Sequence, residues 1–164
     1  MKRLILMRHA KSDWSDLTAS DHARTLNNRG QRGAEALGEW LCGLAIRPDH
    51  ALCSDSARTT ETLSRLALGD VPATTTRDLY LAEPDVMAAA LRRMEWDCVL
   101  MIGHNPGCAM LADMLLTQRP DHEAFDRFPT CATLIADFDI SSWRDLKVGT
   151  GTAVHFTVPR DLTK

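Results

Sequence analysis

The chain contains short, fully apolar segments of the kind that form strands buried on both faces of a sheet. Three such segments, at positions 4–7, 50–53 and 98–102, are followed by polar or charged residues. This pattern predicts central strands of a parallel sheet. Two later segments, 133–138 and 153–158, alternate apolar with polar side chains more clearly. We expect these two to be strands as well, lying nearer an edge of the sheet.

Between the predicted strands, apolar residues recur at the spacing of an amphipathic helix. The pattern predicts helices at 31–46, 57–68, 84–94 and 106–116. The last two begin with a proline, which suits the first turn of a helix. Strands that alternate with helices predict a three-layer α/β/α sandwich with a mostly parallel sheet. Segment 117–130 is the one long polar connection. The sequence shows no repeat and no second domain, so we expect residues 1–164 to form a single domain.

Composition restricts the class of protein. The chain has 164 residues, of which 45% are hydrophobic and 25% charged, as in an ordinary globular domain. Its longest apolar run, at 86–91, is far shorter than the roughly 20 residues of a membrane-spanning helix. The apolar run after the basic N-terminus is shorter than the apolar region of a secretion signal, which has roughly 7 to 15 residues. We therefore expect a cytoplasmic protein without a membrane partner.

Charge and cysteine content exclude further classes. The net charge of −3 gives no general attraction to nucleic acid, so any site for a polyanion must be local. The five cysteines form no C-x-x-C pair, which favours reduced, mostly buried thiols over a disulfide framework or a zinc site. We expect neither a nucleic-acid partner nor a metal.

Candidate chemistry follows each of the three predicted central strands. Arg8 and His9 follow the first strand, Arg58 follows the second within a few residues, and His104 follows the third. The carboxyl ends of parallel strands meet at one edge of a sheet, so these four side chains are expected to converge. Arg58 and His104 also lie close to predicted helix starts. The combination predicts a pocket for a dianion such as a phosphoryl group, which the protein either holds or transfers.

Two other kinds of site have less support. Asp13 lies four residues beyond His9 and with His104 suggests a metal site, but the chain has no H-E-x-x-H motif and no third paired ligand. A serine hydrolase is disfavoured because no G-x-S-x-G motif is present. We interpret Ser54 and Ser56 as caps of the helix that carries Arg58.

Several segments together resemble the histidine phosphatase superfamily. They are R-H-A-K-S-D-W at 8–14, L-N-N-R-G at 26–30, the S-x-x-x-R-x-x-x-T element at 54–62 and G-H-N at 103–105. The small SixA-like phosphohistidine phosphatases are the most similar branch. They share D-x-x-R at 21–24, G-H-N-P-G at 103–107, and the later Pro129-Thr130, Trp143 and Pro159. The resemblance spans most of the chain and implies a phosphoglycerate mutase-like fold.

The resemblance also implies roles for the site residues. His9 would attack phosphorus and become transiently phosphorylated, while Arg8, Arg58 and His104 bind the equatorial oxygens. Lys11 is a further candidate for contact with the bound group or the partner. Nearby guanidiniums should lower the pKa of His9 and keep it nucleophilic, whereas His104, facing phosphate, should favour its charged form. No metal or other cofactor is implied.

One element departs from the superfamily pattern. The general acid usually lies in an L-x-E element, and here Leu81 occupies the place of the glutamate. Glu83 or Asp13 could substitute for it. A phosphorylated imidazole needs a dedicated acid less than an alkoxide does, so the departure favours a P–N substrate.

The chain is also too short for a sizeable cap insertion, which leaves room for a phosphate carried on another protein. We therefore hypothesise a metal-independent phosphatase acting on phosphohistidine in a phosphotransfer domain or phosphocarrier. A phosphomonoesterase or mutase acting on small phosphoesters is the alternative within the superfamily. A phosphate-binding adaptor without turnover is the alternative of another class.

Overall fold

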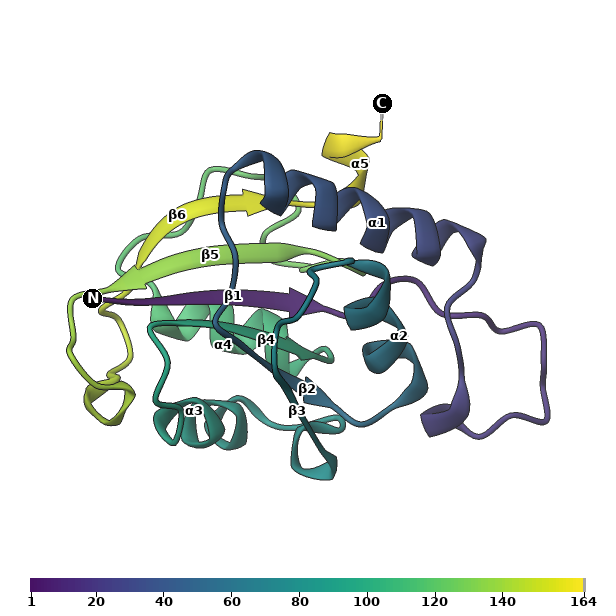
Figure 1. The fold of residues 1–164 in the computed structure, drawn as a ribbon, viewed down its shortest axis with the longest axis horizontal. Helices are drawn as coiled ribbons and strands as arrows, with labels where there is room; N and C mark the ends of the chain where they lie inside the picture. Colours follow the sequence, from purple (N-terminus) through teal and green to yellow (C-terminus); the bar gives the residue numbers. More distant parts are fainter. Residues whose placement is uncertain (164) are drawn as a thin grey trace.

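A six-stranded mixed sheet forms the centre of the molecule in the computed structural model, which describes residues 1–163 (Figure 1). The strands are β1 (Lys2–Arg8), β2 (His50–Ser54), β3 (Ala73–Thr76), β4 (Cys98–Gly103), β5 (Thr133–Phe138) and β6 (Thr152–Thr157). Their order is β3-β2-β4-β1-β5-β6. The first four pair in parallel, whereas β5 runs antiparallel to β1 and β6 antiparallel to β5.

Helices cover both faces of this sheet, which confirms the predicted α/β/α sandwich. On one face lie α1 (Asn28–Gly43), α2 (Ala57–Arg65) and the short α5 (Pro159–Leu162); on the other lie α3 (Pro84–Arg92) and α4 (Gly107–Leu115) (Figure 1). Short 3-10 helices occur at Asp21–Ala23, Arg77–Leu79 and Trp143–Asp145. None of the helices within residues 1–163 has the length and apolar character needed to cross a bilayer.

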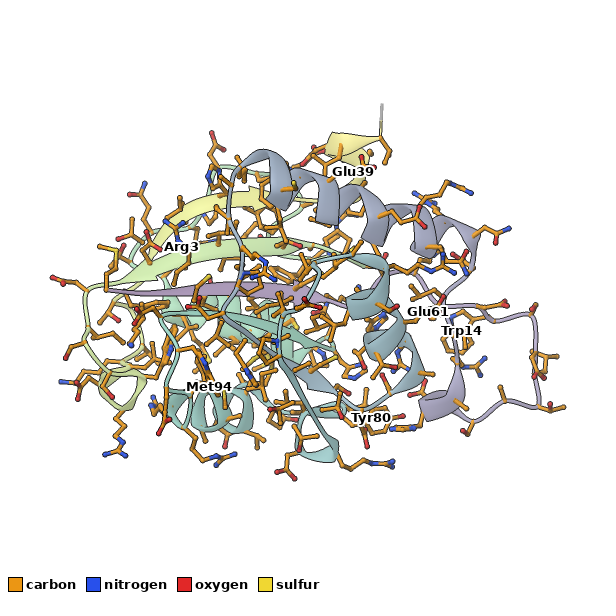
Figure 2. All side chains as sticks on the ribbon, in the orientation of Figure 1. Arg3, Trp14, Glu39, Glu61, Tyr80 and Met94 are labelled. Atoms are coloured by element: carbon orange, nitrogen blue, oxygen red, sulfur yellow. The ribbon has the colours of Figure 1, made fainter. Side chains whose placement is uncertain are left out.

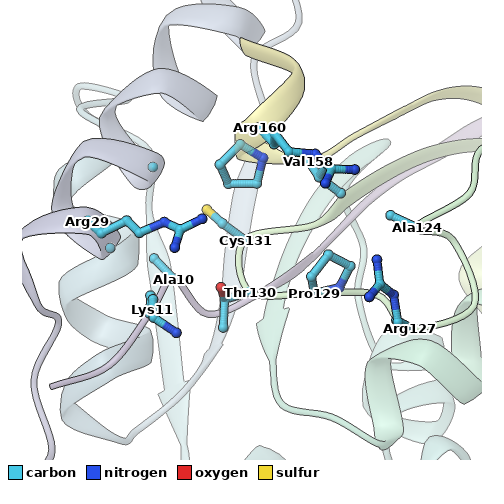
Figure 3. Close-up of a pocket in the computed structure, with 13 residues that line it drawn as sticks. Ala10, Lys11, Arg29, Ala124, Arg127, Pro129, Thr130, Cys131, Val158 and Arg160 are labelled. Carbon is cyan, nitrogen blue, oxygen red and sulfur yellow. The ribbon is translucent and has the colours of Figure 1, made fainter. Parts of the chain in front are cut away.

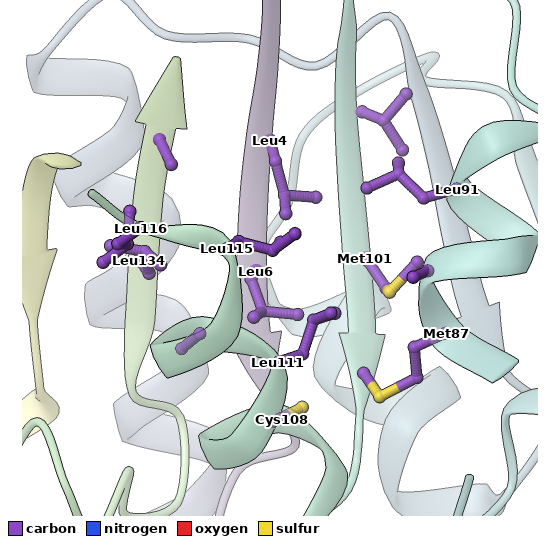
Figure 4. Close-up of a cluster of buried hydrophobic side chains, with 14 of the residues drawn as sticks. Leu4, Leu6, Met87, Leu91, Met101, Cys108, Leu111, Leu115, Leu116 and Leu134 are labelled. Atoms are coloured by element: carbon purple, nitrogen blue, oxygen red, sulfur yellow. The ribbon is translucent and has the colours of Figure 1, made fainter. Parts of the chain in front are cut away.

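Alternation along β1 divides the buried side chains between the two helical layers. Leu4 and Leu6 belong to the cluster that packs under α3 and α4, and Ile5 and Met7 belong to the cluster under α1. All four side chains are fully buried. Figure 4 shows Leu4 and Leu6 facing Leu111 and Leu115 of α4, with Met87 and Leu91 of α3 alongside. The sheet is thus buried on both faces, as the apolar runs predict.

The structure differs from the sequence-based expectations in β3 and at the start of α1. β3 was not predicted, because its A-T-T-T sequence is polar and largely exposed at the edge of the sheet. The prediction that β5 and β6 lie nearer an edge is confirmed, since β6 is the edge strand and β5 is next to it, although β5 is enclosed between β1 and β6 and is almost entirely buried. α1 begins at Asn28 rather than residue 31, because the Asn27 side chain accepts a hydrogen bond from the amide of Gly30 and caps the helix there.

The start of α1 lies directly against the segment that follows β1. A Cβ atom added to Gly30 would lie 2.1 Å from the carbonyl oxygen of Lys11, so a larger residue could not fit without moving the backbone. The amide of Asn27 also donates to that same carbonyl. These contacts fix the position of the chain just beyond the carboxyl end of β1, where the candidate catalytic residues begin.

Candidate active site

The four side chains predicted to converge lie in one pocket at the carboxyl ends of β1, β2 and β4. Arg8, His9, Arg58 and His104 all line this pocket, which has a volume of about 260 Å³. The ring centroids of His9 and His104 are 5.3 Å apart. Trp14, also in the lining, lies beyond the end of β1, while Arg3 lies near its start (Figure 2). The expected meeting of distant segments around one pocket is therefore present.

Backbone hydrogen bonds hold His9 at the end of β1. Its amide donates to the carbonyl of Gly103, and its carbonyl accepts from the amide of Cys131. The Nδ1 atom of the ring lies 2.7 Å from the carbonyl oxygen of Ala10. A carbonyl can only accept, so Nδ1 carries the proton, and a neutral His9 then has its lone pair on Nε2.

His9 is buried, and its surroundings favour the neutral ring. Burial lowers the pKa of His9 from its ordinary value of 6.5 to about 4; Arg8 and Arg58 lower it too, against the hydrogen bond to Ala10. The direction agrees with the sequence-based expectation, but desolvation contributes more than the guanidiniums do. At neutral pH the ring is therefore uncharged and has a free electron pair.

Arg58 is held by Asp21, a residue that precedes it by 37 positions. Its Nη1 donates to the backbone carbonyl of Asp21 at 2.7 Å, and its Nη2 donates to the Asp21 carboxylate at 3.0 Å. Tyr80 donates a further hydrogen bond to the same carboxylate. The Arg58 side chain is only 6% exposed, because it projects from the first turn of α2 into the pocket. The guanidinium is thus fixed before any anion binds.

His104 has a partner on each ring nitrogen. Nδ1 accepts from Nη2 of Arg58 at 3.3 Å, since a guanidinium can only donate, and Nε2 lies 2.8 Å from the Ser54 hydroxyl. Ser54 therefore supports His104, and the prediction that it caps α2 is wrong. Ser56 does cap that helix, accepting from the amide of Thr59.

The protein's own charges do not favour the charged form of His104. Burial, followed by the neighbouring His9 and Arg58, lowers the pKa of His104 to about 3. The expectation of a charged His104 concerns a ring that faces phosphate; in the protein without an anion the ring is neutral, because it is deeply buried. An anion close to Nδ1 would act in the opposite direction and favour protonation of this nitrogen.

Arg8 has few internal partners for its guanidinium. Nη1 makes one long hydrogen bond, 3.4 Å, to the carbonyl of Phe128. Nε is buried and has no hydrogen-bond partner among residues 1–163. Asn105 also donates to the Phe128 carbonyl, at 2.9 Å, and so ties the loop after β4 to the segment before β5. Arg8 thus keeps donors available in the pocket.

Comparison of the sequence with known proteins identifies the family of this chain. The model of the histidine phosphatase superfamily (branch 1) matches residues 4–83. An uncharacterised protein of Mycobacterium tuberculosis is 33% identical to this chain, and one of Mycobacterium leprae is 31% identical. Each match covers 94% of this chain and the full length of the relative. The chain belongs to the histidine phosphatase superfamily.

Solved structures place this superfamily member close to SixA proteins. A protein provisionally assigned as the phosphohistidine phosphatase SixA of Nakamurella multipartita matches with a TM-score of 0.83 and 25% identity, over 96% of both chains. The protein histidine phosphatase SixA in complex with tungstate matches with a TM-score of 0.76 and 24% identity, over 98% of this chain and 99% of that one. The predicted resemblance to the SixA-like branch of the superfamily and the predicted phosphoglycerate mutase-like fold are confirmed.

Neither carboxylate proposed as a general acid lines the pocket. Glu83 is exposed at the start of α3 and makes no side-chain capping hydrogen bond. Asp13 accepts from the amide of Ser15, which lowers the pKa of the carboxyl. Leu81, at the position of the usual glutamate, does line the pocket and has a positive φ of 52°. The structure therefore does not bring either candidate acid to the histidines.

Asp21 is the carboxylate that the structure places in the pocket lining. The Tyr80 hydroxyl and the Arg58 guanidinium hold the pKa of this carboxyl below its ordinary value, so it stays ionised. Sequence reasoning noted Asp21 only as part of a family motif and assigned it no role. Its spacing from Arg58 offered no signal of contact, because the two residues meet through a loop between β1 and α1.

Lys11 lies at the border of the pocket and is exposed. Within residues 1–163, no group of three or more His, Cys, Asp or Glu side chains has an arrangement that could hold a metal ion. The ionisable groups in the lining are two guanidiniums, two imidazoles, the Lys11 ammonium and the Asp21 carboxylate. The guanidiniums, the imidazoles and the ammonium suit the oxygens of a phosphoryl group better than they suit a cation.

Proposed function

We propose that this protein hydrolyses phosphohistidine on a partner protein by way of a phosphorylated His9. The observation that carries the proposal is the pairing of His9 Nδ1 with the Ala10 carbonyl, inside a pocket that also contains Arg8, Arg58 and His104. This hydrogen bond leaves Nε2 with the electron pair that attacks phosphorus. The likeness to SixA structures supports the choice of a phosphoprotein substrate.

In the first step, Nε2 of His9 forms a bond to phosphorus as the bond to the substrate imidazole breaks. The leaving nitrogen keeps the electron pair of that bond and takes a proton from water. In the second step, water attacks the phosphorus of phosphorylated His9 and loses a proton to solvent. Nε2 then leaves with its electron pair, which regenerates neutral His9 and releases inorganic phosphate.

The remaining side chains stabilise charge on the transferred group. Arg58, fixed by Asp21, and Arg8, with donors available, bind the equatorial oxygens, where phosphoryl transfer needs positive charge. As the dianion approaches, Nδ1 of His104 gives up the hydrogen bond that it accepts from Arg58, takes a proton from solvent and becomes a third donor. Because this chain supplies the charge, we infer that turnover does not need a metal.

The scarcity of acids in the pocket favours a P–N bond over an ester. Asp21, the carboxylate in the lining, is ionised and hydrogen-bonded to Arg58 and Tyr80. An alkoxide leaving group would lack a proton donor there, whereas an imidazole leaves readily once its nitrogen is protonated.

Access to the pocket also supports a protein-borne substrate. Trp14 and Leu81, which line the pocket, are 63% and 53% exposed. Large exposed apolar side chains at the border of a polar site are typical of surfaces that contact a protein partner. We infer that residues 1–164 form a single domain without a sizeable cap, so that a folded carrier reaches His9 directly.

A comparison of the rates for different substrates tests this function. A histidine-phosphorylated phosphocarrier and a panel of small phosphoesters are supplied separately to the purified protein in the presence of EDTA. We expect release of phosphate from the carrier with a kcat/KM higher than for any ester, and no change when EDTA is omitted. Faster hydrolysis of an ester would support the phosphomonoesterase instead, and binding without turnover of either class would support an adaptor.

A further inference from the structure

A second cavity, of about 190 Å³, opens beside the catalytic pocket and shares Lys11 and Thr130 with it. We call it the basic groove. Figure 3 shows Lys11 and Arg29 on one side of it and Arg127 on the other, with Thr130 and Cys131 between them. Three separate segments form it: the start of α1 with the loop after β1, the stretch before β5, and the start of α5. The catalytic mechanism uses neither arginine.

The basic groove has positive charge that the described residues do not neutralise. Its lining contains four cationic side chains and no acidic one. Arg160 is paired with Glu123 at 2.6 Å. Lys11, Arg29 and Arg127 are exposed, and no ion pair joins them to an acidic residue within 1–163.

Apolar atoms line the rest of the groove. They come from Ala124, Pro129, Val158 and Pro159. Cations along the sides of an apolar floor suit a segment of polypeptide with acidic side chains and some apolar surface, more than they suit a small free anion. The common border at Lys11 and Thr130 lets one chain occupy the groove while a residue of the same partner enters the catalytic pocket.

We propose that the basic groove binds an acidic segment of the substrate protein that lies beside its phosphohistidine. This inference rests on the proposed function, since it assigns the phosphoryl group to the pocket and the neighbouring acidic residues to the groove. The groove then selects among phosphohistidine proteins by local charge. Its exposed cations also raise the rate of encounter with an acidic partner, an effect that salt screens.

Binding of synthetic peptides tests the groove separately from catalysis. Each peptide contains a non-hydrolysable phosphoryltriazolylalanine in place of phosphohistidine. Two acidic peptides have four Asp/Glu residues, one before the analogue and the other after it, and each has a neutral counterpart with four Ser/Gln residues in the same place. Wild-type protein is expected to bind one of the acidic peptides about tenfold more tightly than its neutral counterpart, as two or three partly exposed charge pairs would produce. This preference should decrease between 50 and 500 mM NaCl.

Variants locate the preference on the surface. In the double variant Arg29→Ala, Arg127→Ala, the ratio of the affinities for the acidic and the neutral peptide should fall to about one. The neutral peptide serves as the reference within each variant. Arg144→Ala, which removes an exposed arginine of the 3-10 helix at Trp143–Asp145, should keep the wild-type ratio. Equal affinity for acidic and neutral peptides, or a ratio that survives the double substitution, would overturn the inference.

Turnover of the matching phosphohistidine peptides separates this inference from the proposed function. If the acidic preference is seen in binding but no peptide is dephosphorylated, the groove is supported and the phosphatase assignment fails. If phosphohistidine peptides are dephosphorylated with the same kcat/KM whatever their flanking charge, the function is supported and the groove proposal fails.

Discussion

The catalytic pocket and the basic groove lie side by side and are both cationic, but they hold their cations differently. In the pocket, the Arg58 side chain is almost fully buried and makes two hydrogen bonds to Asp21 and one to His104. In the groove, Arg29 and Arg127 are exposed, and no acidic side chain among residues 1–163 pairs with them. One region has a buried cation held by hydrogen bonds, and the other has exposed cations without ion-pair partners among the described residues.

This difference suits the two regions to two purposes, catalysis in the pocket and selection of partners in the groove. A guanidinium fixed in a region of low dielectric stabilises charge in a transition state strongly, because little reorganisation is needed when the reaction occurs. An exposed guanidinium interacts weakly and is screened by salt. We therefore expect pocket substitutions to change kcat and groove substitutions to change the selection of partners.

The largest expected effect is a difference in kcat between substitutions of two arginines of α2, the buried Arg58 and the more exposed Arg65. Arg58→Ala removes a fixed donor of the pocket and should lower kcat by about 10³-fold, near the upper end for a single oxyanion donor. Arg65→Ala removes an arginine of α2 whose side chain is 40% exposed and should leave kcat within about twofold of wild type. Phosphate release from a phosphohistidine carrier measures both, and circular dichroism checks the fold. Equal rates for the two variants would contradict the division of roles.

A smaller effect concerns the wall that the two regions share. In Gly30→Ala, the new Cβ would lie 2.1 Å from the Lys11 carbonyl oxygen, so the backbone must move, and we expect the free energy of unfolding to fall by about 2 kcal/mol, as overpacking does. Gly43→Ala, at the other end of α1, has no atom within 4 Å of the new Cβ and should stabilise by up to about 1 kcal/mol. Urea denaturation measures the pair. A Gly30→Ala protein as stable as wild type would exclude this close contact.

A further expected effect is the response of the pocket to acid. His9 and His104 have folded-state pKa values of about 4 and about 3, below the ordinary 6.5, so the unfolded chain binds more protons. Stability is therefore full above pH 6.5 and decreases as the pH falls towards 4, by at most about 1.4 kcal/mol per pH unit for each histidine. Urea denaturation between pH 7 and pH 5 should show a smaller slope for His9→Ala than for wild type. An unchanged slope would mean that His9 is not held neutral by the fold.

Much of the fold could be predicted because buried strands have a simple signature. The apolar runs of β1, β2 and β4 identified the centre of the sheet, and the residues that follow them identified Arg8, His9 and His104 as neighbours. β3 was missed because an exposed edge strand need not be apolar. The full order of the strands was not predicted, since it depends on pairing between distant segments.

The site was predictable where function and strand ends coincide. Asp21 was not, because its contact with Arg58 depends on how the loop after β1 folds back over the pocket. The basic groove also has no motif, since its arginines come from three separate segments. The neutral state of His104 follows from burial, which sequence spacing does not report.

The most direct test of the central claim is to trap the phosphorylated intermediate and locate the phosphate. The protein is mixed with a histidine-phosphorylated carrier, quenched in alkali within milliseconds, and analysed by mass spectrometry of its peptides. We expect a phosphoryl group on His9 that is stable in base, lost in acid and absent from His9→Ala. A phosphoryl group found on another residue, or one that persists in His9→Ala, would contradict the assignment of His9 as the nucleophile.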